Sequence, residues 1–120
     1  MVYILLAGEK YYRYRSGRRS NIIYIGTTGK GAGRPAASAV NKASQVFYKL
    51  HGVKTIEVYV VTSAGRKAMP TWKYLEAGLI HAFEDLHYQL PKFNKKRPAY
   101  VEDRIFKQKA LENLIGHFAP

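Results

Sequence analysis

Cysteine is absent from this chain of 120 residues. Its absence excludes disulfide bonds and thiolate metal sites. Long apolar runs are missing too, and no stretch approaches the roughly 18 residues that a membrane-spanning helix needs. The opening residues, MVYILLAGEK, have neither the basic leader nor the cleavage site of a secretory signal. We therefore expect a cytoplasmic protein that does not associate with membranes.

Acidic residues are scarce. Eight Asp and Glu stand against twenty Lys and Arg, which gives a net charge of +12 and a pI of about 10.0. The segment from Lys10 to Ile56 contains ten basic residues and no acidic one. A one-sign segment of this kind predicts a polyanion as partner. The aromatic content of 13% favours nucleic acid over an anionic membrane, since no strongly amphipathic basic helix is present. The alternative is a basic surface that only keeps the protein soluble.

The length and an apolar content of 47% suit one domain with a packed core. Apolar periodicity and turn signals predict strands and helices in the order ββαβαα, at residues 2–6, 21–25, 35–50, 54–62, 71–87 and 101–117. We expect the α/β (α+β) class, with a three-stranded, mainly antiparallel sheet flanked by helices. Residues 10–19 alternate Tyr and Arg before a Ser-Gly turn signal, which suits a long two-stranded arm with only its base in the core.

Glu76 stands in the middle of an apolar helix face. At 100° per residue, Trp72, Ile80 and Phe83 lie within about 40° of it around the helix. Burial among such neighbours raises the pKa of a carboxyl group or demands a compensating partner. That partner is either an arginine from the sheet or a metal ion, and a lone carboxylate completed by waters suits Mg²⁺. His87, at the end of the same helix, is interpreted as a residue favoured by the helix dipole.

Arg34 follows a glycine-rich loop and precedes a predicted helix. Backbone N–H groups and the helix dipole favour an anion at such a place, and a guanidinium there can hold two phosphate oxygens. A surface arginine without a partner is the alternative. Tyr3 and Tyr24 lie on the first two predicted strands, where each alone suits the core, but two tyrosines on paired strands can present their hydroxyls to one cleft.

The order of these residues resembles the GIY-YIG nuclease family, over roughly residues 1–97. The resemblance implies a ββαβα core with a shallow cleft. The remaining residues, 98–120, are expected to form a C-terminal helix packed on the same domain. The positions that correspond to the family pattern are Tyr3, Tyr24, Gly26, Arg34, Glu76 and Asn94. By this correspondence Glu76 is the metal ligand, Arg34 the helix arginine, and Gly26 and Asn94 have structural roles.

The sequence departs from the family pattern in three places. The first motif reads Met1-Val2-Tyr3 and lacks its glycine, and the two tyrosines are 21 residues apart, farther than is usual. Many members carry a Lys after the second motif or a His one turn after the arginine, where this chain has Thr27 and Ser38. Lys30 is a candidate substitute for the missing lysine.

Together these observations predict a metal-dependent endonuclease that hydrolyses phosphodiester bonds in nucleic acid, with DNA favoured. Mg²⁺ or Mn²⁺ on Glu76 is the expected cofactor, Tyr3 or Tyr24 assists the attacking water, and Arg34 stabilises the transition state. The residues expected to hold the nucleic-acid backbone are Arg13, Arg15, Arg18, Arg19, Lys30, Lys92, Lys95, Lys96 and Arg97. Since the chain leaves no room for a targeting domain, a homodimer or a targeting partner is expected.

Two other functions fit parts of the sequence. A catalytically inactive module with the same fold would bind DNA or RNA, and the missing glycine suits a decayed site. A small basic RNA-binding protein associated with the ribosome would explain the charge of +12. It would leave Glu76 without a role.

Overall fold

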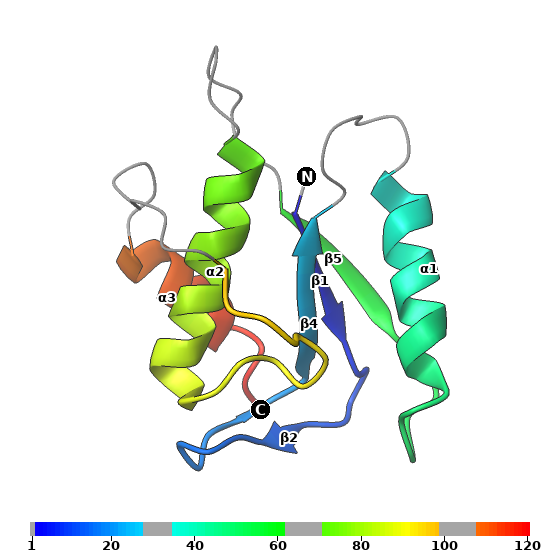
Figure 1. Cartoon of the computed structure of the whole chain (residues 1–120). Helices are drawn as coiled ribbons and strands as arrows, with labels where there is room; N and C mark the ends of the chain where they lie inside the picture. Colours follow the sequence, from blue (N-terminus) through cyan, green and yellow to red (C-terminus); the bar gives the residue numbers. More distant parts are fainter. Residues whose placement is uncertain (1, 28–34, 62–70, 99–107) are drawn as a thin grey trace.

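The computed structural model describes residues 2–27, 35–61, 71–98 and 108–120 (Figure 1). Within these residues the elements are β1 (Val2–Leu6), β2 (Tyr12–Arg13), β3 (Arg19–Ser20), β4 (Ile22–Thr27), α1 (Pro35–Phe47), β5 (Glu57–Val61), α2 (Thr71–His87) and α3 (Gln108–Gly116). Strands β4, β1 and β5 form an antiparallel sheet in that order, and β2 pairs with β3 as a separate ribbon. The expected α+β architecture with a three-stranded antiparallel sheet is confirmed.

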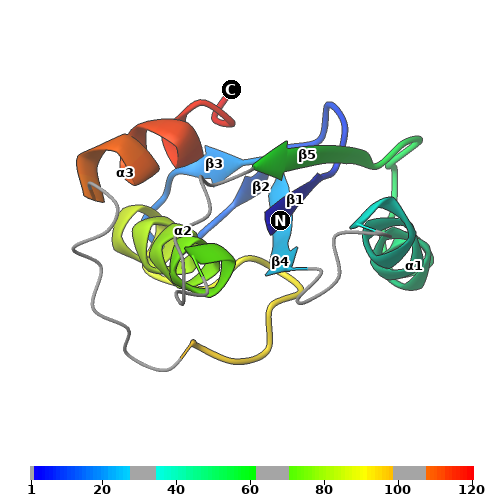
Figure 2. The same ribbon diagram turned by 90° about the horizontal axis from the view of Figure 1, so that it is seen from above.

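The central strand β1 is buried on both faces because helices cover both sides of the sheet. Val2, Ile4 and Leu6 belong to the core that α2 and α3 share, while Tyr3 and Leu5 belong to a second core on the α1 side. Figure 2 shows α1 on one side of the sheet and α2 with α3 on the other. A strand enclosed in this way is expected to read as a continuous apolar run rather than an alternating one.

Helix α2 provides the main apolar stripe. Leu75, Leu79 and Phe83 are at most 4% exposed, as the periodicity predicts. Helix α3 packs on α2 at Gly78, where an added Cβ would lie 2.7 Å from Cδ1 of Leu111. The side chain of Trp72 lies outside the described residues, and so do residues 101–107 of the predicted last helix. None of the described helices is long and apolar enough to cross a membrane.

The arm folds back onto the body of the domain. Tyr14, near its tip, is only 4% exposed and packs edge-on against Phe83, with ring centroids 4.9 Å apart. Its hydroxyl donates to the carbonyl of Ile22 (2.6 Å) and accepts from the backbone N–H of Lys92 (3.2 Å). The prediction that only the base of the arm enters the core is therefore wrong. A tyrosine can bury its ring and still satisfy its hydroxyl, so the polar sequence around it does not keep the arm in solvent.

Tyr14→Phe tests this anchor. The substitution keeps the ring but leaves a buried carbonyl at Ile22 and the Lys92 N–H without their partner, which costs about 1–3 kcal/mol for each group that finds no water. We expect a loss of about 1–3 kcal/mol in the free energy of unfolding, measured by urea denaturation. Tyr11→Phe, at a position 37% exposed on the same arm, is the matched control and should be neutral. Equal stability of the two variants would contradict an anchored arm.

Candidate functional site

The sheet brings Tyr3 and Tyr24 together. Tyr3 on β1 is opposite Gly26 on β4, and Tyr24 is opposite Leu5, so both tyrosines lie on the α1 face two positions apart along the ladder. Their ring centroids are 6.0 Å apart, with an angle of 34° between the planes. A side-chain hydrogen bond joins the two residues. Tyr3 is 5% exposed and Tyr24 is half-buried, so the pair reaches solvent through Tyr24.

Gly26 makes this pairing sterically feasible. A Cβ at this position would lie 2.5 Å from Cε2 of Tyr24 and 2.9 Å from the hydroxyl oxygen of Tyr3. Side chains essentially never approach so closely, because repulsion rises steeply below van der Waals contact. Gly26 therefore has a specific physical role. Because it has no side chain, the rings of Tyr3 and Tyr24 can occupy the space next to its Cα.

Glu76, the third candidate residue, lies on α2. Burial raises the pKa of its carboxyl group, and the nearby Lys73 lowers it. Its charge contributes to raising the pKa of Tyr24, which places the carboxylate within electrostatic reach of that hydroxyl. Among the described residues no arginine forms an ion pair with Glu76, so the predicted sheet arginine is not found there. The candidate site thus takes one residue from each of three elements, β1, β4 and α2.

The environment of Tyr24 keeps its hydroxyl protonated. Burial, the neighbouring Tyr3, the Glu76 charge and the hydrogen bond to Tyr3 together raise its pKa to about 12. At pH 7 only about one molecule in 10⁵ would carry the phenolate. With the protein groups alone, Tyr24 is therefore suited to a hydrogen-bond relay rather than to proton abstraction. The sequence leaves open whether Tyr24 acts as a general base or as a hydrogen-bond relay. Its raised pKa favours the relay.

Lys42 is a site residue that the sequence patterns did not reveal. It lies on α1, and its Nζ is 4.5 Å from the centre of the Tyr24 ring, over the aromatic face. An ammonium at this distance is held by a cation–π interaction. The signal that could have identified it is its position eight residues after Arg34, the spacing of two helical turns. Arg34 and Lys30 themselves lie outside the described residues.

Asn94 closes the free edge of β4. Its Oδ1 accepts from the N–H of Ile25 and its Nδ2 donates to the carbonyl of Ile25, both at 2.9 Å. The N–H of Phe93 donates to the carbonyl of Ile23 at 2.9 Å. The side-chain amide thus acts as an additional strand residue next to Tyr24. These bonds attach the basic segment 91–97 to the edge of β4, next to Tyr24 in the sequence of that strand.

The basic residues predicted to hold a phosphate backbone are exposed wherever the structure describes them. They are Arg13, Arg15, Arg18, Arg19, Lys92, Lys95, Lys96 and Arg97. Arg13 and Arg19 are directly opposite each other in the β2–β3 ribbon. Like charges at such a pair of positions are destabilising unless an anion lies between or beside them. The two arginines therefore concentrate positive charge at one place on the surface of the arm.

His87 is not held as a cation. It is 3% exposed, and its ring packs on Phe83 with a centroid distance of 4.3 Å. Burial, with a smaller contribution from Arg18, lowers its pKa to about 4. The interpretation that the helix dipole favours this residue as a charged terminus is therefore wrong, because desolvation of the ring outweighs the dipole. At neutral pH His87 is an uncharged core residue.

A metal ion would have few protein ligands here. Within the part of the chain that the structure describes, no group of three or more His, Asp or Glu residues could hold a metal. Glu76 is half-buried and forms no ion pair with another described residue, and such a carboxylate fits a hard cation that keeps most of its waters, as Mg²⁺ does. It does not fit a structural zinc site, which needs four ligands.

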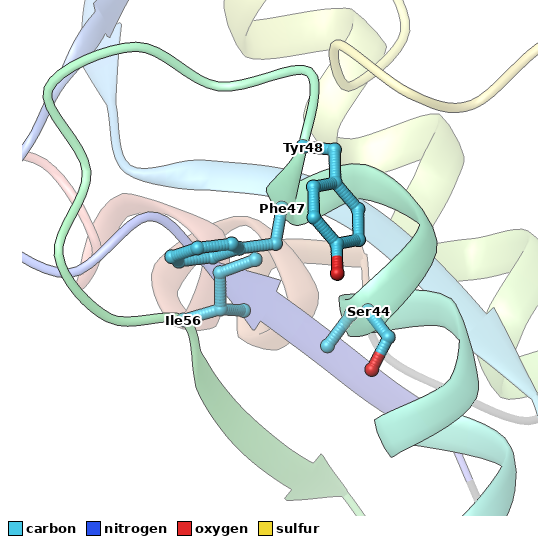
Figure 3. A pocket seen from close by; sticks show the side chains of 5 residues that line it. Ser44, Phe47, Tyr48 and Ile56 are labelled. Carbon is cyan, nitrogen blue, oxygen red and sulfur yellow. The ribbon is translucent and has the colours of Figure 1, made fainter.

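A hollow of about 210 Å³ lies elsewhere, beside α1. Ser44, Phe47, Tyr48 and Ile56 line it together with Ala43 (Figure 3). None of these side chains carries an ionisable group suited to hydrolysis at neutral pH. The hollow shares no residue with the tyrosine pair or Glu76, and it is not the candidate site.

The chain matches no protein-family model, no curated protein and no solved structure with which it was compared. The resemblance to GIY-YIG nucleases therefore stays a prediction from short motifs. The functional conclusion depends instead on the positions of the side chains described above.

Proposed function

We propose that this protein is a metal-dependent endonuclease that hydrolyses phosphodiester bonds in nucleic acid, with DNA as the expected substrate. The observation that supports it most is the hydrogen-bonded pair of Tyr3 and Tyr24, with the charge of Glu76 within electrostatic reach of the Tyr24 hydroxyl. Burying polar hydroxyls and a carboxylate costs free energy of folding. Two hydrogen-bonded hydroxyls near a half-buried carboxylate are therefore an unfavourable arrangement for stability alone. Such clusters concentrate at functional sites.

Glu76 is the residue that would hold Mg²⁺ or Mn²⁺, with waters completing the shell. When bound there, the ion supplies positive charge to a phosphate and its leaving oxygen. A cation at Glu76 would also offset the desolvation that raises the pKa of its carboxyl group. The donor set is a single hard oxygen ligand on the protein, consistent with either of these ions.

The protein's own groups orient the reactants. The Tyr24 hydroxyl, held by Tyr3, positions an attacking water by hydrogen bonding. The water oxygen forms a bond to phosphorus as the ester bond to the leaving oxygen breaks, and the proton released by the water ends on that oxygen or in solvent. Lys42 beside Tyr24, with Arg34 as the family resemblance implies, supplies charge for the phosphate oxygens.

One observation favours a second candidate, a module of the same fold that binds nucleic acid without cutting it. The pKa of Tyr24 is about 12, so this residue is a poor base without further help. Such a module would keep the basic surface and the folded position of Asn94 while losing turnover. The two candidates differ in one measurable property, hydrolysis in the presence of a divalent ion.

A nuclease assay on the whole chain decides between them. A labelled branched DNA that carries both duplex and single-stranded segments is incubated with Mg²⁺ or Mn²⁺, and parallel reactions contain EDTA. We expect cleavage products with either metal and none with EDTA, because the hydrolysis needs the ion on Glu76. Tight binding of the same DNA with no product under any metal would reject the nuclease and favour the module.

A further inference from the structure

A polar groove of about 420 Å³ lies where the arm, the end of α2 and residues 91–97 meet. The N–H of Arg15 donates to Oε1 of Gln89 at 2.8 Å, and the N–H of Ser16 donates to the carbonyl of His87 at 3.2 Å. These contacts hold the tip of the arm against the end of α2. Two basic segments that are about 75 residues apart in sequence thereby line one groove.

The groove is strongly basic. Arg15, Lys92, Lys95 and Arg97 line it, against a single carboxylate, Glu84, among its lining residues. Glu84 is already engaged, since its Oε2 lies 2.6 Å from Nε of Arg97. Cations arranged along a groove attract a phosphate backbone and set its path, without reading its sequence.

Tyr88 presents an aromatic ring to this groove. It follows directly after α2, lines the groove and is 67% exposed. No ring contact with another aromatic residue engages it among the described residues, in contrast to the buried Tyr14 and Phe83. A large exposed aromatic side chain amid cations is the combination that single-stranded nucleic acid uses, with bases on the ring and phosphates on the cations.

The backbone of Tyr88 has a conformation that is unfavourable for any residue with a side chain. Its φ is +58°, and it is the only non-glycine residue with a positive φ in the part of the chain described. This conformation after a helix is normally adopted by glycine, since a Cβ is strained there. Within the described ranges, Gly8, Gly17 and Gly52 also have a positive φ. A tyrosine where glycine would fold better suggests that the ring itself is needed.

The groove leads toward the candidate active site. Asn94 lines the groove and also bonds to Ile25 on β4, which is flanked by Tyr24 and Gly26. The groove therefore lies next to the edge of β4, the strand that carries Tyr24.

We propose that this groove binds an unpaired strand of nucleic acid, with one base stacked on Tyr88 and the adjacent phosphates held by Arg15, Lys92 and Lys95. The inference rests on the proposed function for its class of ligand and deepens it: the substrate carries a single-stranded segment next to the cleavage point. A purely double-stranded substrate would offer no base to the ring, because its bases are stacked on one another.

Fluorescence anisotropy with the whole chain tests the proposal. The probes are a fluorescein-labelled single strand of about 12 nucleotides and the duplex of the same sequence, both in EDTA so that no cleavage occurs. Tyr88→Ala should weaken binding of the single strand by about 5- to 150-fold, the range measured for one stacked base. Tyr88→Phe should bind as the wild type does, and the duplex should be affected less than about 2-fold.

The matched control is Tyr48→Ala, at a tyrosine that is 88% exposed, follows directly after α1 and lines the separate hollow of Figure 3. It should leave binding of both probes unchanged. Salt titrations separate stacking from charge: Tyr88→Ala should keep the wild-type slope, while Lys95→Ala should reduce it by about 0.7 on the single strand. Wild-type binding by Tyr88→Ala, or an equal loss on the duplex, would overturn the stacking role.

Tyr88→Gly guards against misfolding as an explanation. Because glycine relieves the strain at φ +58°, the midpoint of thermal unfolding should rise by roughly 4 °C while single-strand binding weakens as in Tyr88→Ala. A more stable variant that binds less well cannot be explained by unfolding. The test is also independent of catalysis: a wild type that binds through Tyr88 but never cuts would reject only the nuclease.

Discussion

Glu76→Gln should abolish cleavage while leaving nucleic-acid binding close to the wild-type level. The amide is nearly isosteric with the carboxylate but carries no charge, so it cannot attract Mg²⁺ to the tyrosine pair. Loss of the metal removes a contribution of several kcal/mol to the transition state, so single-turnover cleavage should fall by at least about 10³-fold. The basic groove and arm are untouched, so the dissociation constant for DNA in EDTA should change little.

The same variant makes a prediction about stability and pH. Burial raises the pKa of the Glu76 carboxyl group in the folded state, so the folded protein holds this proton more tightly than the unfolded chain does. The resulting stability is fully present below the unfolded pKa and is lost as the pH rises through the raised, folded value. Glu76→Gln should therefore be more stable than the wild type at pH 7, and the difference should disappear as the pH falls below the unfolded value. Urea denaturation at several pH values measures it.

Glu57→Gln is the matched control for both measurements. It makes the identical chemical change at an exposed carboxylate on β5, away from the groove and the tyrosine pair. Exposed surface charges contribute little to stability, so neither stability at pH 7 nor cleavage should change appreciably. If Glu76→Gln cut DNA as fast as Glu57→Gln does, Glu76 would have no part in catalysis and the proposed metal site would be wrong.

Local patterns predicted the elements of this fold but not the contacts between distant segments. The apolar run of β1 and the stripe of Leu75, Leu79 and Phe83 on α2 follow from periodicity, because burial repeats with the geometry of a strand or helix. The anchor of the arm does not, since the hydroxyl of Tyr14 meets the N–H of Lys92 across 78 residues. No short window of sequence encodes that contact.

Some residues of the candidate site were likewise predictable from local sequence, while others depend on tertiary contacts. Motif order predicted that Tyr3, Tyr24 and Glu76 belong together, and the antiparallel register supplies the reason for the two tyrosines. Lys42 was not predicted, because a lysine on a helix is ordinarily a solvated residue. Only its tertiary contact with the Tyr24 ring distinguishes it. The conformation of Tyr88 was not predicted either, because propensities do not favour a positive φ for tyrosine.

Gly26→Ala should reduce cleavage by about 100-fold or more with only a moderate loss of stability. The new Cβ would lie 2.5 Å from Cε2 of Tyr24 and 2.9 Å from the Tyr3 hydroxyl, so at least one ring must move. Tyr24 is half-buried and can swing outward, which limits the cost to about 1–3 kcal/mol. The movement breaks the hydrogen bond between the tyrosines, and a misplacement of about 1 Å at a catalytic group typically costs about 10²-fold in rate.

Alanine substitutions at two other glycines distinguish displacement of the tyrosines from a general loss of stability. Gly78→Ala puts a Cβ 2.7 Å from Cδ1 of Leu111 at the α2–α3 contact, so it should also cost about 1–3 kcal/mol, yet it leaves the tyrosines in place. Gly116→Ala adds a Cβ with nothing within 4 Å and should be neutral or slightly stabilising. Single-turnover cleavage well below the unfolding midpoint should therefore be lost in Gly26→Ala alone. If Gly78→Ala lost as much activity as Gly26→Ala, the defect would reflect stability, and the tyrosine pair would not be the catalytic arrangement. Retention of full cleavage by Gly26→Ala would show that hydrolysis does not depend on the two rings as the sheet positions them.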